Sequence, residues 1–112
     1  MSKEKYLWIS ASKPKPGKEE EYNRWYDQHV TTFFKFPGLK RVRRNKCVNP
    51  FEFGDKCVQY VTIYEFDSKE DLEAFGKSEA AQIAKKEYAD GWEEVGEGGW
   101  TGWWKTVKTL ER

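Results

Sequence analysis

Apolar and aromatic side chains recur at steps of three and four residues along residues 19–39. The recurring positions are Tyr22, Trp25, Tyr26, His29, Val30, Phe33 and Phe36. This spacing predicts a helix that turns one face to a core. The three glutamates at 19–21 favour a helix start there, because negative charge meets the positive end of the helix dipole. Pro37 and Gly38 end the helix, since proline cannot continue it and glycine accepts the turn.

Four other segments are predicted as strands, and all but the second are rich in the β-branched and aromatic residues that are typical of strands. They are Lys5–Ala11, Leu39–Cys47, Cys57–Phe66 and Trp100–Leu110. The second of these is basic on both faces, which suits the edge of a sheet.

A second helical region is predicted from Ser68 to about Ala89. Ser68 with Asp71 resembles a capping box, and a break is expected near Gly76–Ser78. The glycine-rich, acidic segment 91–99 predicts a loop. The order of the elements is then β-α-β-β-α-β. This order predicts a ferredoxin-like α+β fold, in which two helices cover one face of a four-stranded antiparallel sheet. At 112 residues the chain has the length of a single domain, residues 1–112.

The two faces of the predicted strands differ in character. One is mainly aliphatic, with Leu7, Ile9, Val42, Val61, Ile63 and Val107. The other is amphipathic, with Tyr6, Trp8, Ser10, Arg41, Arg43, Tyr60, Thr62, Tyr64, Trp104 and Thr106. We expect the aliphatic face to pack on the helices. A second copy of the chain is expected to cover the amphipathic face, because monomers rarely expose a wide band of rings. The enclosed space would be lined by rings, hydroxyls and arginine, as in small-molecule sites.

Composition removes several classes of partner. With 20 basic and 19 acidic residues the net charge is +1, so no overall field attracts nucleic acid or an anionic membrane. The basic run at 35–46 lies beside several phenylalanines, and ferredoxin-like sheets can bind RNA through strand aromatics. The specific RNA-binding strand motifs are absent from the sequence, so a solvated edge strand is the favoured interpretation and no nucleic-acid partner is expected. No apolar run approaches the roughly 18 residues that span a bilayer. The first residues lack the apolar region of a signal peptide, so we expect a cytoplasmic protein.

The same expectation makes Cys47 and Cys57 reduced thiols. Two cysteines without further ligands do not predict a zinc site, and no metal or cofactor is expected.

His29 is the only histidine and the first candidate for chemistry. Imidazole titrates near neutral pH without help, as a general acid or base requires. The alternative is a core histidine whose nitrogens are satisfied structurally. Candidate substrate-binding residues are Trp8, Trp25, Tyr26, Arg43, Tyr60, Tyr64 and Trp104. Rings stack on flat substrates, tyrosine hydroxyls orient carbonyls, and arginine binds carboxylates or enolates. For each of them, ordinary packing or a solvated edge is the alternative.

The run Tyr22–Val30 (YNRWYDQHV), followed by Phe36-Pro37-Gly38, resembles the dimeric α+β barrel superfamily, in particular its EthD-like branch. The first helix of that branch carries a W-Y-x-x-H-like motif before a P-G turn. Residues 63–68 (IYEFDS) are similar in kind to the family's entry into its second helix. The chain departs from the pattern at Thr31, where family members often have proline.

The resemblance implies a homodimer with a pocket in each half, and it does not imply one reaction. Relatives include lactone isomerases, polyketide and phenol cyclases, and quinone-forming and haem-degrading monooxygenases. The leading hypothesis is a cofactor-independent enzyme of the isomerase, cyclase or monooxygenase type. In it His29 acts as general acid/base on a small aromatic or unsaturated substrate. One alternative is a non-catalytic ligand-binding or stress-type barrel. A second is a haem-binding or haem-degrading protein with His29 as axial ligand, which a visible absorption spectrum would reveal.

Overall fold

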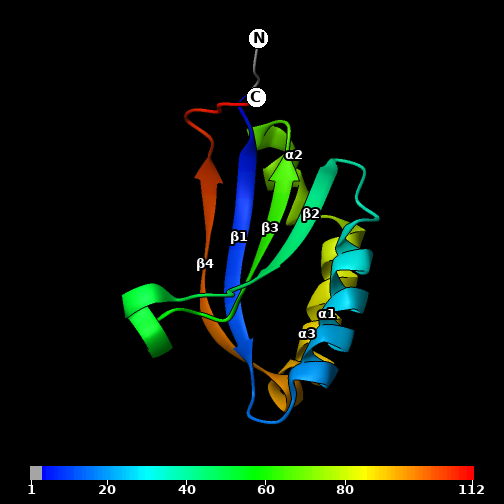
Figure 1. The fold of residues 1–112 in the computed structure, drawn as a ribbon. Helices are drawn as coiled ribbons and strands as arrows, with labels where there is room; N and C mark the ends of the chain where they lie inside the picture. The colour runs from blue at the N-terminus through cyan, green and yellow to red at the C-terminus, as the bar shows by residue number, and fades with distance from the viewer. Residues whose placement is uncertain (1–3) are drawn as a thin grey trace.

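The computed structural model describes residues 4–112, so residues 1–3 of the predicted domain lie outside it. A four-stranded antiparallel sheet has the order β2-β3-β1-β4. Its strands are β1 (Tyr6–Pro14), β2 (Leu39–Lys46), β3 (Tyr60–Phe66) and β4 (Gly96–Lys105). The helices are α1 (Glu19–Phe33), α2 (Lys69–Phe75) and α3 (Glu79–Val95), with a 3₁₀ segment η1 (Phe51–Lys56) between β2 and β3. Figure 1 shows α1 and α3 side by side and α2 behind the sheet. This is the predicted ferredoxin-like α+β fold.

The helix boundaries follow the predicted signals in part. The Ser68 hydroxyl accepts a hydrogen bond from the Asp71 N–H, and the Ser78 hydroxyl accepts one from the Ala81 N–H, each at 3.1 Å. These two caps begin α2 and α3, so the break predicted near 76–78 is confirmed. The helix α1 begins at Glu19 as expected but ends at Phe33, because the chain tightens into i→i+3 turns before Pro37.

The predicted loop at 91–99 is wrong, since α3 continues to Val95 and β4 begins at Gly96. Two glycines in this segment serve close packing. A Cβ at Gly91 would lie 3.1 Å from Trp25 Nε1, so this glycine lets α3 approach α1. A Cβ at Gly96 would lie 2.5 Å from the Trp92 ring, which covers the start of β4. Glycine-rich composition therefore misled the prediction, because glycine also marks places where neighbouring groups pack closely.

The predicted assignment of the sheet faces is also wrong. Tyr60, Thr62, Tyr64 and Phe66 alternate along β3 and are buried, whereas the intervening Val61 and Ile63 are only half-buried. Trp8 stacks on Tyr64, with ring centroids 4.4 Å apart. Rings from the helices, including Phe33 and Phe75, pack on this pair. The aromatic face meets the helices because its rings fill the space between the two layers, which small aliphatic side chains would leave open.

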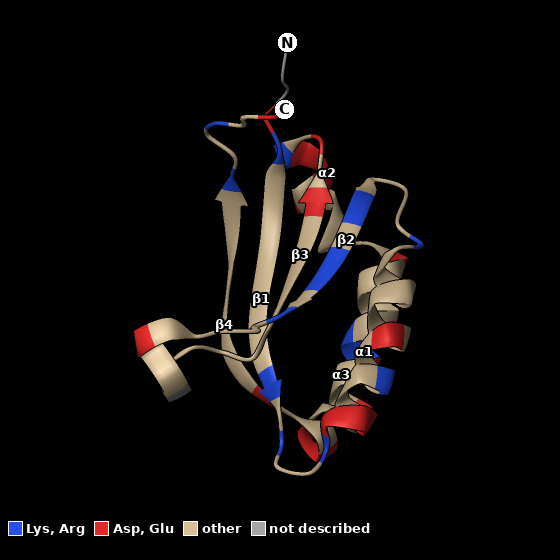
Figure 2. Cartoon of the chain, in the orientation of Figure 1, with Lys and Arg blue, Asp and Glu red and all other residues tan. Residues whose placement is uncertain are grey.

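The other face of the sheet is uncovered. Pairing across the strands places Leu7 beside Trp104, Ala11 beside Trp100 and Arg43 beside Ile63 on this face. Trp100 and Trp104 are 48% and 51% exposed. The basic residues of β2 follow the edge strand, as the sequence predicted, and Figure 2 shows them in blue. Val107 lies beyond the end of β4 and is 91% exposed, so it packs on no helix.

A second ring cluster attaches α1 to the lower half of the sheet. It joins Tyr22, Tyr26, Tyr60 and Trp92. The Arg44 guanidinium lies against three of these rings, 4.3 Å from the Tyr26 centroid, and donates a hydrogen bond to Asn23 Oδ1 at 2.8 Å. Burial raises the pKa of Tyr22 to about 12. This tyrosine therefore serves as a neutral packing and hydrogen-bonding group at ordinary pH.

Cys47 and Cys57 flank η1, and both are free thiols, with their sulfur atoms 3.8 Å apart. Within residues 4–112, no helix is long and apolar enough to cross a membrane. The described side chains, which leave out that of residue 55, contain no group of three or more histidine, cysteine or carboxylate side chains placed to hold a metal ion.

Candidate functional site

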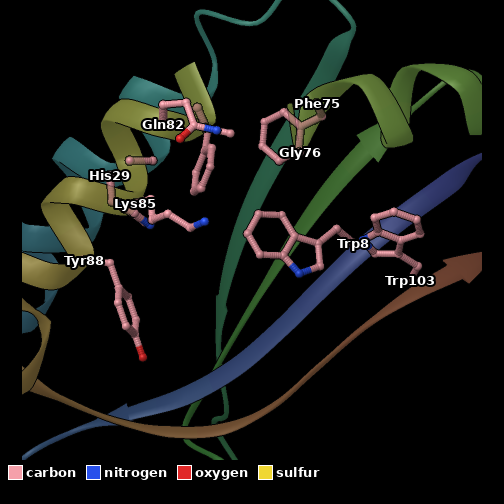
Figure 3. A pocket seen from close by; sticks show the side chains of 11 residues that line it. Trp8, His29, Phe75, Gly76, Gln82, Lys85, Tyr88 and Trp103 are labelled. Atoms are coloured by element: carbon pink, nitrogen blue, oxygen red, sulfur yellow. The ribbon is translucent and has the colours of Figure 1, made fainter. Parts of the chain in front are cut away.

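A cavity of about 350 Å³ lies between the helices and the aromatic face of the sheet. Trp8 from β1 and Trp103 from β4 form the sheet wall, and Phe75 and Gly76 close the end beside α2. Figure 3 shows these side chains facing Gln82, Lys85 and Tyr88 of α3 across the open space. The lining of the cavity is mostly apolar, with a few polar groups on the helical wall, as in small-molecule sites.

His29 contributes the imidazole on that helical wall. Its side chain comes from α1 and the residue is 7% exposed. The Trp25 ring stacks on the imidazole at 4.3 Å, and the Phe33 ring meets it edge-on at 4.7 Å. Both lie one helical turn away, so the periodicity of α1 fixes the ring between them.

Glu87 of α3 fixes the orientation of the imidazole. His29 Nδ1 lies 3.0 Å from Glu87 Oε1, and Glu87 Oε2 accepts a hydrogen bond from the Thr32 hydroxyl at 2.7 Å. Because a carboxylate only accepts, Nδ1 carries the hydrogen of this bond. In the neutral ring the lone pair then lies on Nε2, the nitrogen opposite the carboxylate. No hydrogen bond to Nε2 is found among the described residues.

Burial lowers the pKa of His29, and the hydrogen bond and charge of Glu87 oppose that effect without cancelling it. The imidazole is therefore neutral at pH 7, which is the form that accepts a proton. A neutral ring oriented by a carboxylate is the arrangement of a general base.

Trp8 on the sheet wall of the cavity is held by several contacts. Trp8 Nε1 donates a hydrogen bond to Thr101 Oγ1 at 2.5 Å, and the indole stacks on Tyr64 behind it. Phe33 and Phe75 pack against the same indole at centroid distances of 5.3 and 5.7 Å. The indole that a ligand meets on β1 is thus held in one orientation.

A second cavity of about 280 Å³ adjoins the first and shares Trp8 and Tyr88 with it. Hydroxyl groups of Ser10, Ser12 and Tyr26 contribute to its lining. A ligand longer than the first cavity would extend into this adjoining space.

The structure gathers some of the sequence-predicted site residues. Trp8 and His29 line the main cavity, and Tyr26 lines the adjoining one. Trp25 packs on His29 from behind and lines neither cavity. Tyr64 lies beneath Trp8 in the core.

Three predicted residues lie away from the main cavity. Tyr60 belongs to the second ring cluster, and its hydroxyl donates to Glu19 Oε2 at 2.5 Å. Arg43 and Trp104 lie on the uncovered face of the sheet, opposite His29. The sequence pattern predicts Arg43 and Trp104 on the same face of the sheet as Trp8, and this prediction is wrong. The observed register places Arg44 and Trp103 on the helical side instead.

Sequence reasoning missed the residues that α3 contributes. Ala81, Ala84, Lys85 and Tyr88 line the cavity at the spacing of one helix face, and this periodicity was readable in the sequence. Glu87 belongs to the neighbouring face, and its contact with His29 depends on how α1 and α3 pack together.

Comparison with known proteins identifies the fold. No protein-family model matches the chain, and no curated protein matches it. Solved structures do. A protein of the EthD family from Bacillus halodurans has a TM-score of 0.66 at 12% identity, over 95% of this chain and 99% of that one. The chain has the fold of the dimeric α+β barrel superfamily.

Two further structures share this barrel fold. A dimeric protein of unknown function and ferredoxin-like fold from Bacteroides fragilis has a TM-score of 0.60 at 16% identity, over 91% of this chain and 96% of that one. SnoaB, a cofactor-independent oxygenase from Streptomyces nogalater, has a TM-score of 0.63 at 13% identity, over 99% of this chain and 100% of that one. These structures confirm the fold that the resemblance at residues 22–38 implies.

Proposed function

We propose that the chain is a cofactor-independent enzyme that binds a small aromatic or unsaturated molecule and uses His29 as its general base. The observation that carries the proposal is the hydrogen bond of 3.0 Å between His29 Nδ1 and Glu87 Oε1 at the wall of the cavity. This bond leaves the lone pair of the neutral ring on Nε2, and His29 lines a space large enough for a ligand.

The chemistry begins with a proton transfer. Nε2 takes a proton from an acidic C–H or O–H of the bound molecule, and the electron pair of that bond stays on the substrate. The positive charge that develops on the imidazole is stabilised by the Glu87 carboxylate. The anion then picks up a proton elsewhere in an isomerisation, attacks a carbonyl carbon in a cyclisation, or reacts with oxygen in a monooxygenation.

The walls supply binding and orientation. Trp8, Phe75 and Trp103 offer flat apolar surfaces, against which an aromatic or conjugated substrate packs. A bound substrate would displace water from these apolar walls, and electrostatic interactions there would then be stronger than in solvent. SnoaB, whose fold this chain shares, is a cofactor-independent oxygenase, and this supports the choice of an enzyme over a passive binder.

We also propose that the protein works as a homodimer. The uncovered sheet face carries Leu7, Ile9, Val61 and Ile63 in its centre, with Trp104 at one side. A second copy of the chain would remove this apolar strip from water. The Bacteroides fragilis protein, which has the same fold, is dimeric.

Deuterium exchange tests the proton-transfer step without knowledge of the full reaction. Acetophenone carries a ring and α-hydrogens, and proton NMR in D₂O follows the exchange of those hydrogens. The wild-type protein is expected to accelerate the exchange. His29→Gln and His29→Phe are expected to lower the accelerated rate by about 10²-fold or more, the usual contribution of a general base. Asp27→Asn, an exposed change on the same helix, serves as the matched control.

The non-catalytic alternative gives a different result. In that case acetophenone or a related ring compound would quench tryptophan fluorescence on binding, but its exchange would proceed at the buffer rate. His29→Phe would then bind the compound as well as the wild type does. This combination would contradict the proposed enzyme.

A further inference from the structure

We propose that the Lys85 ammonium binds the oxyanion that forms when His29 deprotonates the substrate, so that the site selects phenols and enolisable ketones. This inference rests on the proposed function and adds a second residue to it. It assigns the substrate an oxygen atom that becomes negative, placed within reach of α3.

Lys85 has a special place in the cavity. Among the residues that line it, Lys85 is the only lysine, arginine, aspartate or glutamate. Figure 3 shows its side chain extending from α3 across the space toward Trp8, with the nitrogen at the far end. A positive charge therefore faces an otherwise apolar wall of rings.

The Lys85 ammonium has no carboxylate partner among the described side chains. Both oxygens of Glu87, which lies two residues further along α3, are engaged by His29 and Thr32. Among the side chains that the structure describes, those of residues 4–54 and 56–112, none forms a hydrogen bond or ion pair with Lys85, whereas Lys5, Lys46 and Lys105 each meet a carboxylate. The charge of Lys85 is thus available to a ligand.

The His29 imidazole and the Lys85 ammonium act in the same proton-transfer step. When a C–H or O–H proton moves to Nε2, the electron pair ends on the substrate oxygen as an enolate or phenolate. A bare anion is costly next to apolar walls. An ammonium aimed at that oxygen offsets this cost where the charge develops, as oxyanion-stabilising groups do in other enzymes. Lys85 and the Glu87 that orients His29 belong to the same helix, so the packing of α3 on α1 sets both positions together.

Binding of 4-nitrophenol tests this role without turnover, because its phenolate form absorbs visible light. Titrating the bound probe with pH gives the relative affinity of the site for phenolate and phenol. The Lys85→Met variant removes the positive charge, and the Lys85→Arg variant keeps it. Lys86→Met is the matched control, since Lys86 is exposed on the same helix and does not line the cavity.

We expect the wild type to bind the phenolate about tenfold more tightly than Lys85→Met does, as a nearby opposite charge favours the ionised form. Lys85→Arg and Lys86→Met are expected to keep most of this preference. Equal preference in the wild type and Lys85→Met would overturn the inference, and so would a wild type that binds only the neutral phenol or neither form. These outcomes are separate from the test of His29, because a loss of exchange in His29→Gln does not depend on how the phenolate binds.

Discussion

His29 and Glu87 lie 58 residues apart in the sequence, and their side chains meet at 3.0 Å across the packed pair of α1 and α3. The contact depends on the close approach of the two helices, which Gly91 allows beside Trp25. It gives the imidazole one defined orientation and one defined tautomer. The proposed chemistry depends on this pair more than on any other contact.

Replacing the carboxylate by an amide should shift the pH dependence of proton transfer. Glu87→Gln keeps a hydrogen-bond acceptor for Nδ1 but removes the negative charge that raises the pKa of His29. The pKa should therefore fall further, and the acidic limb of the exchange rate should move to lower pH. The rate above that limb should decrease, because the charge that stabilises the developing imidazolium is lost. Exchange rates measured from pH 4 to pH 8 check both effects.

The control for this change is Glu94→Gln, an exposed glutamate near the end of the same helix. It should leave the acidic limb where the wild type has it. A limb that stays unmoved in Glu87→Gln would show that the carboxylate does not act on His29.

The stability of the protein should depend on His29 below neutral pH. Burial holds the folded-state pKa below the ordinary value of 6.5, so the unfolded chain takes up a proton first as the pH falls. The free energy of unfolding should therefore decrease as the pH falls from about 6.5 to the folded-state pKa of His29. Above pH 7 the imidazole is neutral in both states, so His29 adds no pH dependence there. Urea unfolding at several pH values measures it. The His29→Phe variant should lose less stability over that range than the wild type, and parallel curves would show that the imidazole is not held neutral.

The α1 pattern was sufficient to predict the helix, its aromatic face and His29, because one strong period and clear end signals occur in a single stretch. The sheet faces were not predictable in the same way. Each face of β3 carries large apolar side chains, Tyr64 and Phe66 on one and Val61 and Ile63 on the other, so alternation alone does not say which is inner. The volume to be filled between sheet and helices decides it, and that volume is a property of the assembled fold.

Only part of the candidate site could be predicted from the sequence. The sequence named His29 and Trp8, which lie on the elements with the clearest patterns. Glu87 and Lys85 were missed because the second helical region was predicted from its start at Ser68, its break and its end, without a reading of its faces. A single acidic residue on an acidic surface also carries no local signal. Arg43 and Trp104 were placed on the wrong side of the sheet by one residue of register, which exchanges the two faces of a strand.

The uncovered sheet face predicts a dimer. Light scattering at micromolar concentration should give twice the 13.3 kDa mass of the chain. Ile9→Lys places a charge in the centre of the apolar strip and should shift the protein toward monomer. Ile83→Lys makes the same change on α3, where the side chain is already 43% exposed, and should leave the dimer intact. A monomeric wild type would remove the proposed assembly.

Cys47 and Cys57 should be dispensable for the proposed chemistry. They lie beside η1, and neither lines the cavity at His29. Replacing both by serine should change the free energy of unfolding by less than about 1 kcal/mol, as expected for side chains outside a core. Chemical denaturation under reducing conditions measures this. A loss of several kcal/mol would show that the thiols hold the η1 segment in place.

The state of His29 itself is the most direct test. Because the chain has one histidine, labelling with ¹⁵N-histidine gives an NMR spectrum of that side chain alone. A two-dimensional ¹H–¹⁵N correlation distinguishes the two tautomers and the charged form, and a pH titration gives the pKa. The predicted result is a neutral ring at pH 7 with the proton on Nδ1, a bare Nε2 and a pKa below 6.5. A proton on Nε2, or a charged ring at pH 7, would contradict the assignment of His29 as the general base.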